Sequence, residues 1–494
     1  MKAIRLLCGK LFFVLFILFL AFTLITTGCG NLPGPPPPAF SGNTNVTVLL
    51  SSMANDQLSQ FGLTFNSLSL TNKAGKKFTL LASPQSTEFM HLNGTVEPLV
   101  TVSVPEGVYT AAAANIGNAY LTCVTLIPST GTVPGGLVTA TYAYGSTPDS
   151  QVSLRLTSPM TITGDHMGVL LNMETLKSET LGSCYSAPGS SNPYSITPTF
   201  DVAPVSFSEQ RANLVETGLY GEVSAVDSAT NTFSTTLADG QSLSVTTDSG
   251  TAFEGIADFS ALTTGMFVNL DVMIQPDGSQ SAKRVGISNL STTDLSILAG
   301  PVLQTNPFSP TGAGPIALVL GPQQQGLLSL NHEASEVMPF NFGSATFQVS
   351  GALTNLQALP FVPSFNDANF VPGQSVYVTT DVSKFVPYMS ASTVTLIPQT
   401  INGTVVQSST SGPFSVYTIL LAPYDLFPAL AVQPGQPTLL SNPDQVEVYI
   451  DSNTQRLTST QLTAGSTLRF RGLVFNDNGT LRMDCAQVFD GVAE

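Results

Sequence analysis

The stretch Leu262-Thr-Thr-Gly265-Met-Phe-Val268-Asn-Leu270 decides the fold of this chain, because close variants of it occur twice more. Each copy has an apolar residue, two spacers, a glycine and then alternating apolar positions. The other two copies are Phe370-Val-Pro-Gly373-Gln-Ser-Val376-Tyr-Val378 and Leu462-Thr-Ala-Gly465-Ser-Thr-Leu468-Arg-Phe470. Alternation with a period of two predicts a β-strand with one buried face. We expect the glycine to occupy a turn with positive φ, which glycine adopts without steric cost.

The regions around these copies also open and close alike. Each opens on Gly-x-Val, at Gly221-Glu-Val223, Gly300-Pro-Val302 and Gly403-Thr-Val405. About twenty residues after the turn glycine, each closes with another strand pattern, at Val285-Gly-Ile287, Val394-Thr-Leu396 and Val488-Phe489. Internal repetition of this kind predicts copies of one module. We therefore expect three small OB-like β-barrels, over residues 217–290, 298–398 and 401–492.

The rest of the exported chain has the same strand character. Apolar residues alternate in Val46–Leu50, Leu99–Val104 and Val152–Leu156, and turn residues recur between such runs. No convincing amphipathic helix of twelve or more residues follows residue 46. The sequence predicts an all-β protein, with a sandwich-like N-terminal domain over residues 45–205 followed by the three barrels.

Two family resemblances agree with this division. The first copy, from Gly221 to Ile287, resembles the bacterial family domain of unknown function 5666, found in exported proteins, and Gln275-Pro-Asp-Gly278 and Ala282 fit its final hairpin. The second and third copies are more diverged. This resemblance implies a small OB-like barrel.

Residues from about 45 to 200 resemble a second family, domain of unknown function 4382. The resemblance rests on an opening strand, on Leu63–Leu70 and on a Pro-x-Gly-x-Tyr turn at Pro105, Gly107 and Tyr109. In that family the turn leads into a strand of a sandwich-like domain. The segment Leu50–Ala54 lacks the family's usual Asp-Ala-Pro. Neither family has a settled activity, so the resemblances imply a fold and no reaction.

The first residues carry an export signal. Lys2, Arg5 and Lys10 precede an apolar run from Leu11 to Ile25, which is too short as a helix for a hydrocarbon core of about 30 Å. Small residues, Thr26-Thr-Gly28, then lead to Cys29. This layout resembles a bacterial lipoprotein signal, which implies a signal peptide over residues 1–28 and diacylation of Cys29. An uncleaved N-terminal anchor and an ordinary cleaved signal remain the alternatives.

Residues 29–44 form a lipidated stalk in this interpretation. Four consecutive prolines, Pro35–Pro38, favour a semi-rigid polyproline II spacer. The glycine after Cys29, in place of Asp, favours sorting to the outer membrane of a Gram-negative bacterium, by resemblance to its lipoproteins. Once residues 1–28 are removed, the chain carries 13 basic and 32 acidic residues, a net charge of −19. That charge argues against nucleic acid as a partner, and it leaves the acyl chains to hold the protein on the membrane.

Three further cysteines remain in the exported chain. Cys123 and Cys184 fall in the same predicted domain, and export permits a disulfide between them; two buried free thiols are the alternative. Cys485 alternates with Met483 in the last predicted strand and is expected as a packed core thiol. Neither a CxxC pair nor clustered histidines accompany these residues, so we expect no metal and no cofactor.

Catalytic motifs are also missing. His332-Glu333-Ala-Ser-Glu336 lacks the second histidine of a zinc protease, and G-x-S-x-G does not occur. Aspartates 227, 239, 277 and 477 fall at turns, where their ordinary role is to bond backbone amides, although a loop calcium ion stays open. Tyr377, Tyr388, Tyr417 and Tyr424 are expected to pack in strands, with sugar stacking as the alternative. Phe- and Pro-rich loops, 360–369 and 423–437, are candidate contact surfaces.

The sequence thus predicts a non-catalytic, lipid-anchored envelope protein that serves adhesion, envelope structure or ligand capture. Its expected partners are the membrane, through the N-terminal lipid, and glycans or envelope proteins. A surface enzyme acting on polysaccharide is one alternative, because two carboxylates are easily hidden among 32 acidic residues. An accessory subunit of an envelope assembly or secretion system is another.

Overall fold

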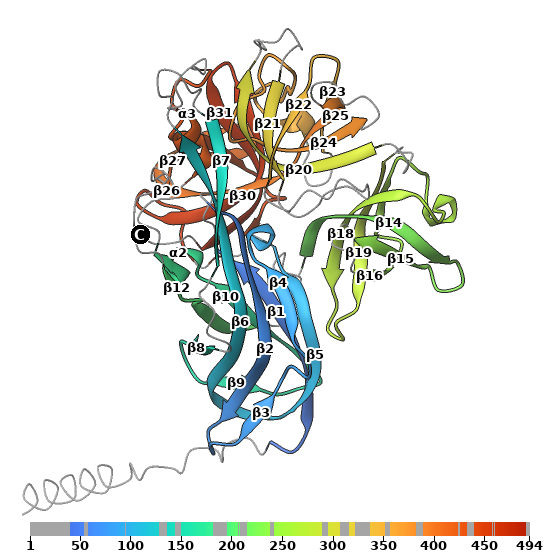
Figure 1. The fold of residues 1–494 in the computed structure, drawn as a ribbon, viewed down its shortest axis with the longest axis vertical. Helices are drawn as coiled ribbons and strands as arrows, with labels where there is room; N and C mark the ends of the chain where they lie inside the picture. Colours follow the sequence, from blue (N-terminus) through green and yellow to red (C-terminus); the bar gives the residue numbers. More distant parts are fainter. Residues whose placement is uncertain are drawn as a thin grey trace, which may run out of the picture. The chain divides into compact units, whose positions relative to one another are not determined.

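The computed structural model describes the chain from residue 40 onward, with gaps. The described residues are 40–53, 58–93, 95–127, 136–143, 150–180, 195–205, 207, 215–237, 242–288, 295–306, 316–321, 336–350, 356–381, 389–422, 425–431, 439–456, 458 and 460–490. The described residues from Asn43 onward belong to one compact unit. In the described residues almost every element is a strand, which confirms the all-β prediction (Figure 1). None of the described helices is long and apolar enough to cross a membrane.

The N-terminal domain is an 11-stranded sheet. Its main path runs β3-β2-β6-β8-β13-β10-β1-β5. In addition, β4 pairs with β2, and both β7 and β9 pair with β6. The strands are β1 (Asn43–Ser52), β2 (Leu58–Asn72), β3 (Lys77–Thr79), β4 (Gln85–Glu88), β5 (Glu97–Pro105), β6 (Gly107–Ile127), β7 (Gly136–Ala143), β8 (Ser150–Leu156), β9 (Met160–Ile162), β10 (His166–Met173) and β13 (Phe200–Val205).

This sheet folds over on itself around one core. Strand β8 joins the two halves, because it pairs antiparallel with β6 and parallel with β13. Phe65 of β2 lies 5.6 Å from Phe200 of β13, measured between ring centroids, and both rings are fully buried. The halves therefore face each other as in a sandwich, although backbone pairing continues from one to the other. The turn at Pro105 and Gly107 does lead into a strand, β6, and the Tyr109 hydroxyl closes it by donating to the Pro105 carbonyl (2.7 Å).

Three six-stranded sheets follow, one from each repeat. Barrel 1 consists of β14 (Val215–Asp227), β15 (Thr232–Leu237), β16 (Ser242–Thr246), β17 (Ala252–Glu254), β18 (Phe267–Ile274) and β19 (Gln280–Ser288). Barrel 2 consists of β20 (Leu295–Asn306), β21 (Ile316–Gly321), β22 (Glu336–Asn341), β23 (Thr346–Val349), β24 (Ser375–Asp381) and β25 (Met389–Leu396). Barrel 3 consists of β26 (Gln399–Ser411), β27 (Phe414–Leu421), β28 (Gln445–Ile450), β29 (Gln455–Arg456), β30 (Thr467–Asp477) and β31 (Thr480–Asp490).

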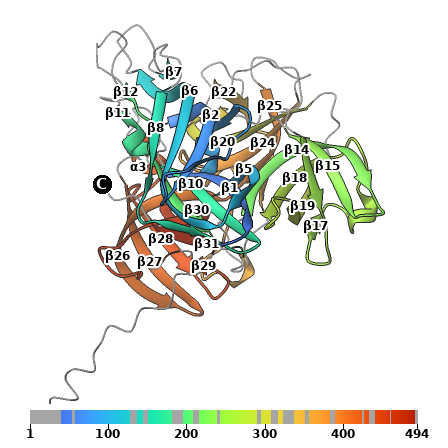
Figure 2. The ribbon, with the colours of Figure 1, turned by 90° about the horizontal axis from the view of Figure 1, so that it is seen from below.

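The three sheets share one topology. In each, the order of the strands within the repeat is third, second, first, fifth, sixth and fourth, and a parallel pairing of the third strand with the sixth closes the sheet. Setting aside the short fourth strand, this is a five-stranded Greek-key barrel of the OB type. Figure 2 shows the barrel 3 strands, in orange and red, curving round a common interior.

The repeated glycines have the same role in all three barrels. Gly265, Gly373 and Gly465 have φ angles of 87°, 95° and 91°, as the sequence predicts. Each donates its backbone N–H to the valine that ends the Gly-x-Val opening, at 2.8 Å, with Val223, Val302 and Val405 as acceptors. Immediately after each of these valines the first strand pairs with the second through a β-bulge. The repeated motif thus fixes the bend that lets the first strand serve both sides of a barrel.

Barrels 2 and 3 also pack against each other. Leu473 and Phe475, on β30 of barrel 3, belong to the same buried cluster as Val376 and Val394 of barrel 2. Gln374 donates its side-chain amide to the Val474 carbonyl (3.0 Å) across the same boundary, in a buried position. The two barrels therefore share an apolar core, which independently folded domains joined by linkers would not do.

Candidate functional site

Ligands of OB-type barrels contact the outer face of the second and third strands and the loops beside it. In barrel 1 these strands are β15 and β16, and in barrel 3 they are β27 and β28. The side chains of the equivalent strands of barrel 2 lie largely outside the described residues. The comparison of candidate faces is therefore between barrels 1 and 3.

The face of barrel 1 is a ladder of hydroxyl groups. Phe233 of β15 and Val245 of β16 point into the core, so the alternating neighbours point outward. Those neighbours form three cross-strand pairs, Thr232 with Thr246, Ser234 with Ser244 and Thr236 with Ser242. The three residues on β16 are exposed and the three on β15 are half-buried. We name these six residues the hydroxyl face.

Hydroxyl groups both donate and accept hydrogen bonds, so the hydroxyl face matches a ligand that is itself rich in hydroxyls. It offers neither the cations that hold phosphates nor the aromatic rings on which bases stack, because all six side chains are Ser or Thr. Glu222, half-buried in β14, is a charged neighbour.

The corresponding face of barrel 3 is covered at one end by a loop of barrel 2, while Leu420, at the other end of the face, is 40% exposed. Phe414, Val416 and Tyr449 on the outside of β27 and β28 form one buried cluster with Leu359, against which Phe361 packs. The Phe361 ring lies 5.1 Å from the Tyr449 ring, between centroids. The sequence singled out loop 360–369 as a contact surface; in the structure its contact is a neighbouring barrel of the same chain. We name Leu359 and Phe361 the covering loop.

A guanidinium closes the edge of this covered face. Arg482 of β31 pairs with Asp477 (Nε to Oδ2, 2.9 Å) and Glu447 (Nη1 to Oε2, 3.2 Å), and it lies over the Phe361 ring at 5.3 Å. The Tyr449 hydroxyl donates to Glu447 (2.9 Å). Burial, with that hydrogen bond to a carboxylate, raises the pKa of Tyr449 to about 12. Aromatic, cationic and anionic groups here satisfy one another, which leaves little of this end of the face for a ligand.

Barrel 1 carries a buried ion pair of its own. Arg284 of β19 bonds Asp271 of β18 (Nε to Oδ2, 2.9 Å), and the two side chains are only 7% and 6% exposed. The guanidinium also reaches Glu254 (3.2 Å) and the side-chain carbonyl of Asn269 (3.0 Å). With its donors distributed over three partners, the guanidinium is a satisfied structural group of the barrel wall rather than a reactive one.

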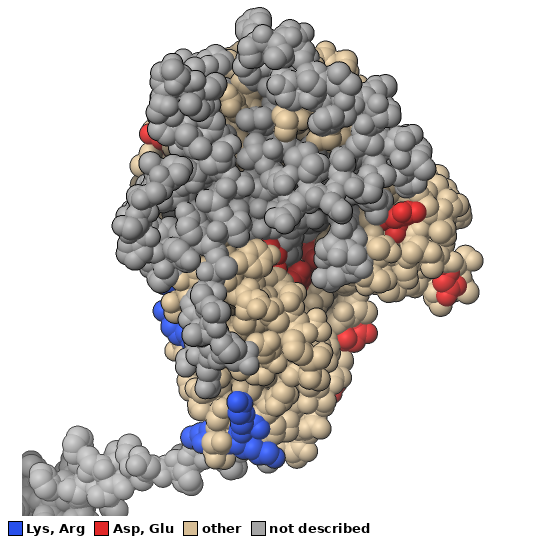
Figure 3. All heavy atoms as spheres, viewed as in Figure 1, with Lys and Arg blue, Asp and Glu red and all other residues tan. Residues whose placement is uncertain are grey.

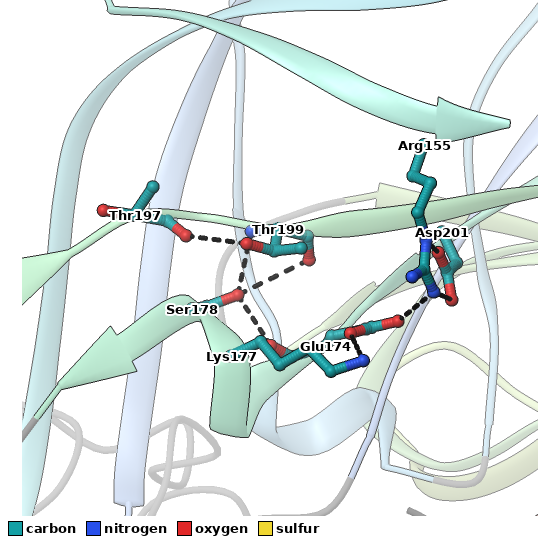
Figure 4. A network of polar contacts seen from close by, with 7 residues as sticks. All are labelled: Arg155, Glu174, Lys177, Ser178, Thr197, Thr199 and Asp201. Atoms are coloured by element: carbon teal, nitrogen blue, oxygen red, sulfur yellow. Dashed lines mark hydrogen bonds and ion pairs between the residues drawn. The ribbon is translucent and has the colours of Figure 1, made fainter.

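The N-terminal domain holds a further cluster of charges (Figure 4). Glu174, which follows β10, is almost fully buried, yet it accepts from Arg155 of β8 (Nη2 to Oε1, 2.8 Å) and pairs with Lys177. The same Nη2 atom donates to Asp201 of β13 (2.7 Å), and the Arg155 Nε also reaches that carboxylate. The cluster thereby ties β8, β10 and β13 together where the two halves of the sheet join.

The two carboxylates of this cluster titrate apart. Burial, and then a hydrogen bond with Asp201, raises the pKa of Glu174, in spite of the neighbouring Lys177. Burial would also raise the pKa of Asp201, but the Arg155 guanidinium lowers it below its usual range. A glycosidase needs its carboxylates on opposite sides of a bound sugar. Here one nitrogen of a guanidinium bridges them, so the arrangement fits a structural ion cluster better than an acid–base pair.

The remaining sequence-predicted residues are placed as follows. Cys485 is a buried core thiol, as predicted; its Sγ–H donates to the Gln487 carbonyl (3.2 Å), and burial raises its pKa. Asp227 and Asp277 accept from nearby backbone amides, as predicted for turn aspartates. Cys29 and Cys184 lie outside the described residues, and only the backbone of Cys123, in β6, is described. The lipidation and the Cys123–Cys184 disulfide therefore stay predictions.

Tyrosines 377 and 417 are buried strand residues, as expected, while 388 and 424 are not among the described residues. Of loop 423–437, Phe427 and Leu430 in α3 (Leu426–Ala431) are buried. In the described part of the chain, no group of three or more His, Cys, Asp or Glu could hold a metal ion. Asp239 and His332 lie outside that part.

The hydroxyl face escaped the sequence reasoning, although its signal is present. Serine or threonine occupies alternate positions in 232–236 and again in 242–246. Only the register of the hairpin, which brings the two sets opposite each other, turns this alternation into one surface.

Comparison with known proteins adds little to this geometry. No family model matches the chain, and no curated protein matches it significantly. A solved structure described as drosophila Unr CSD456 aligns with 57% of this chain and 100% of its own, at 10% identity and a TM-score of 0.13. A likeness that weak carries no argument about fold or function.

Proposed function

We propose that this protein is a non-catalytic, lipid-anchored protein of the bacterial envelope, and that barrel 1 is its ligand-binding module for glycans. The observation that supports the ligand site is the hydroxyl face, with its three cross-strand pairs. Barrel 3 has the same topology, but its equivalent face packs against Phe361. The outward side chains of the third strand are exposed in barrel 1 (β16), whereas those of the third strand of barrel 3 (β28) are half-buried or buried.

Anchoring rests on the sequence. The basic, apolar and small segments before Cys29 resemble a lipoprotein signal, and two or more acyl chains bind a membrane stably. The outer membrane of a Gram-negative bacterium is the proposed location. Replacing Cys29 by Ala should release the protein from membranes or block its maturation, as judged by fractionation and by the mass of the N-terminal peptide. Unaltered retention of an unacylated protein would contradict the anchor.

The ligand site has a separate test. A glycan screen on residues 31–494 would be followed by a Thr236→Val, Ser244→Ala, Thr246→Val variant, which removes three hydroxyls with little change in shape. We expect at least a tenfold loss of affinity for any glycan bound, because each hydroxyl can make a hydrogen bond to a sugar. The matched control is Ser408→Ala with Thr410→Ala, at exposed positions of barrel 3. Equal affinity of both variants would place the site elsewhere, and turnover of a polysaccharide would overturn the non-catalytic proposal.

A further inference from the structure

The β2–β3 hairpin concentrates positive charge in an acidic protein. Lys73, Lys76 and Lys77 fall within five residues and are all exposed, whereas only 13 Lys and Arg follow residue 28 in the whole chain. Figure 3 shows a blue cluster over the end of β2 and β3. We name these three residues the lysine hairpin.

The lysine hairpin is a well-ordered turn. The Asn72 side-chain carbonyl accepts from the amides of Ala74 (3.1 Å) and Lys76 (2.9 Å), and Gly75 provides a φ of +80°. The Lys76 ammonium lies 4.9 Å from the Phe78 ring, which packs edge-on against Tyr109. A turn held in this way keeps the backbone of the three lysines in place, so that only their side chains have to be ordered when a partner binds.

Its place in the sheet is next to the point where the chain enters the domain. Asn43, the first residue of β1, pairs with Pro105 at the end of β5. The next strand, β6, starts at Gly107, and its Val108 carbonyl accepts from the Lys73 amide (2.8 Å). Asn43 falls within the stalk expected from the sequence, but it begins β1, and this first residue of β1 lies at the same end of the domain as the lysine hairpin.

We propose that the lysine hairpin docks this end of the domain on anionic phospholipid headgroups. The proposal rests on the acyl group proposed at Cys29, because the stalk then limits the distance between membrane and domain to roughly 40 Å at about 3.1 Å per residue. Within that reach the local concentration of headgroups is high, so a modest attraction suffices. The net charge of the whole chain opposes membrane contact, and the hairpin locally reverses that sign.

Two acidic residues of the domain share this end, and Asp277 of barrel 1 lies close enough to His166 to interact with it electrostatically. The Glu106 carboxylate accepts from the Gly164 amide (3.0 Å) and the Thr163 hydroxyl (3.3 Å), so it is engaged by the turn before β10. Asp165, in the same turn, is exposed, beside the exposed His166. The three lysines equal these three carboxylates in number, but the lysines are gathered in a single turn. Each lysine near an anionic surface improves binding about fivefold, and the three together on the order of a hundredfold.

Amine footprinting tests the docking directly. The full mature protein would be reconstituted in vesicles of phosphatidylethanolamine with phosphatidylglycerol, or with phosphatidylcholine in its place, and treated with an amine-reactive reagent. We expect the modification of the lysine hairpin to slow at least fivefold on the anionic vesicles at low salt and to recover at high salt. The exposed Lys283 of barrel 1 is the internal control and should react equally on both. Equal rates for the hairpin on the two kinds of vesicle would overturn the proposal.

A variant and a competitor complete the design. In Lys73→Gln, Lys76→Gln, Lys77→Gln protein, the protection that anionic vesicles give to the backbone amides of residues 72–77 in hydrogen exchange should be lost. Protection that persists in this variant would contradict docking by the lysines. If inorganic phosphate removes the protection in the unsubstituted protein, the hairpin is a site for free anions instead. The mass of the Cys29 peptide is read in the same samples. An unacylated Cys29 would contradict the anchor proposal, and this outcome is distinguishable from a failure of the lysine hairpin to dock.

Discussion

Barrels 1 and 3 have the same strands in the same order, yet they use their outer faces in opposite ways. Barrel 1 carries paired hydroxyls on β15 and β16, whereas barrel 3 packs Tyr449 and Val416 beneath the covering loop of barrel 2. Their turn glycines and bulges coincide. The difference shows that the repeated motif specifies only the barrel, while outward positions are free to make one copy a binding surface and another an interface.

The barrels also differ in the residues that face each other across their fifth and sixth strands. Asp271 pairs with Arg284 across β18 and β19 of barrel 1. The pairing of the fifth and sixth strands contains a β-bulge in each barrel, directly after Asp271 in barrel 1. At the equivalent position, barrel 2 has Thr379 opposite Thr393, and barrel 3 has Arg471 opposite Gln487. Barrel 1 is thus the copy with a buried acid–base pair at this place.

The largest effect is expected from breaking that pair. Arg284→Met should cost about 3 to 5 kcal/mol, because it leaves the Asp271 carboxylate buried without its cation. Adding Asp271→Leu should recover a large part of the loss, since a buried pair is replaced by apolar groups more easily than it is halved. Urea unfolding of the protein, with hydrogen exchange as the probe of barrel 1, would measure the free energy of unfolding of both variants. A double variant less stable than the single one would be contrary to this account.

The turn glycines distinguish the copies next. Gly465→Ala should cost about 1 to 2 kcal/mol from backbone strain alone, since nothing lies within 4 Å of an added methyl group. Gly373→Ala should cost about 3 kcal/mol, because the new Cβ would lie 2.5 Å from Cδ1 of Phe427. Thermal unfolding of the two variants side by side checks the order. Equal losses would mean that the Gly373 turn does not press against α3 in solution.

The covering loop gives a smaller effect. Phe361→Ala should destabilise the joined barrels 2 and 3 by about 2 kcal/mol, through lost contacts with Tyr449, Phe475 and Arg482. Val362 is 77% exposed, so Val362→Ala should change stability by less than about 0.5 kcal/mol. Chemical denaturation measures both variants. If the two cost the same, the face of barrel 3 is not covered as described, and the contrast with barrel 1 fails.

The smallest effect is a dependence on pH. The pKa of Tyr449 is raised from 10.0 to about 12 in the folded protein, so between these values the unfolded chain loses a proton that the native state keeps. Stability from this group is present in full below pH 10 and is lost as the pH rises towards 12. In Tyr449→Phe, the denaturation midpoint of barrels 2 and 3 should fall less steeply over that range than in the unsubstituted protein. Parallel curves would show that Tyr449 titrates normally.

Much of the fold was predictable because its signals are local. Alternation of apolar residues predicts strands. Gly265, Gly373 and Gly465 predict the turns that precede three of those strands. Cys485 could be assigned to a core from its alternation with Met483. The candidate site was less predictable. Loop 360–369 looked like a free contact surface. The packing of Phe361 against barrel 3 depends on residues almost 90 positions later, such as Tyr449.

The amino-acid sequence by itself determined the strand class, the threefold repetition and the basic-apolar start that predicts a lipid on Cys29, because each depends on neighbouring residues. Only the tertiary structure decided which barrel keeps an open face, that Glu174 and Asp201 share one guanidinium, and that Lys73 lies at the end of the domain where the chain enters. Those outcomes depend on strand register and on packing between distant segments. A shift of one residue in register would turn the hydroxyls of β16 inward and its apolar side chains outward.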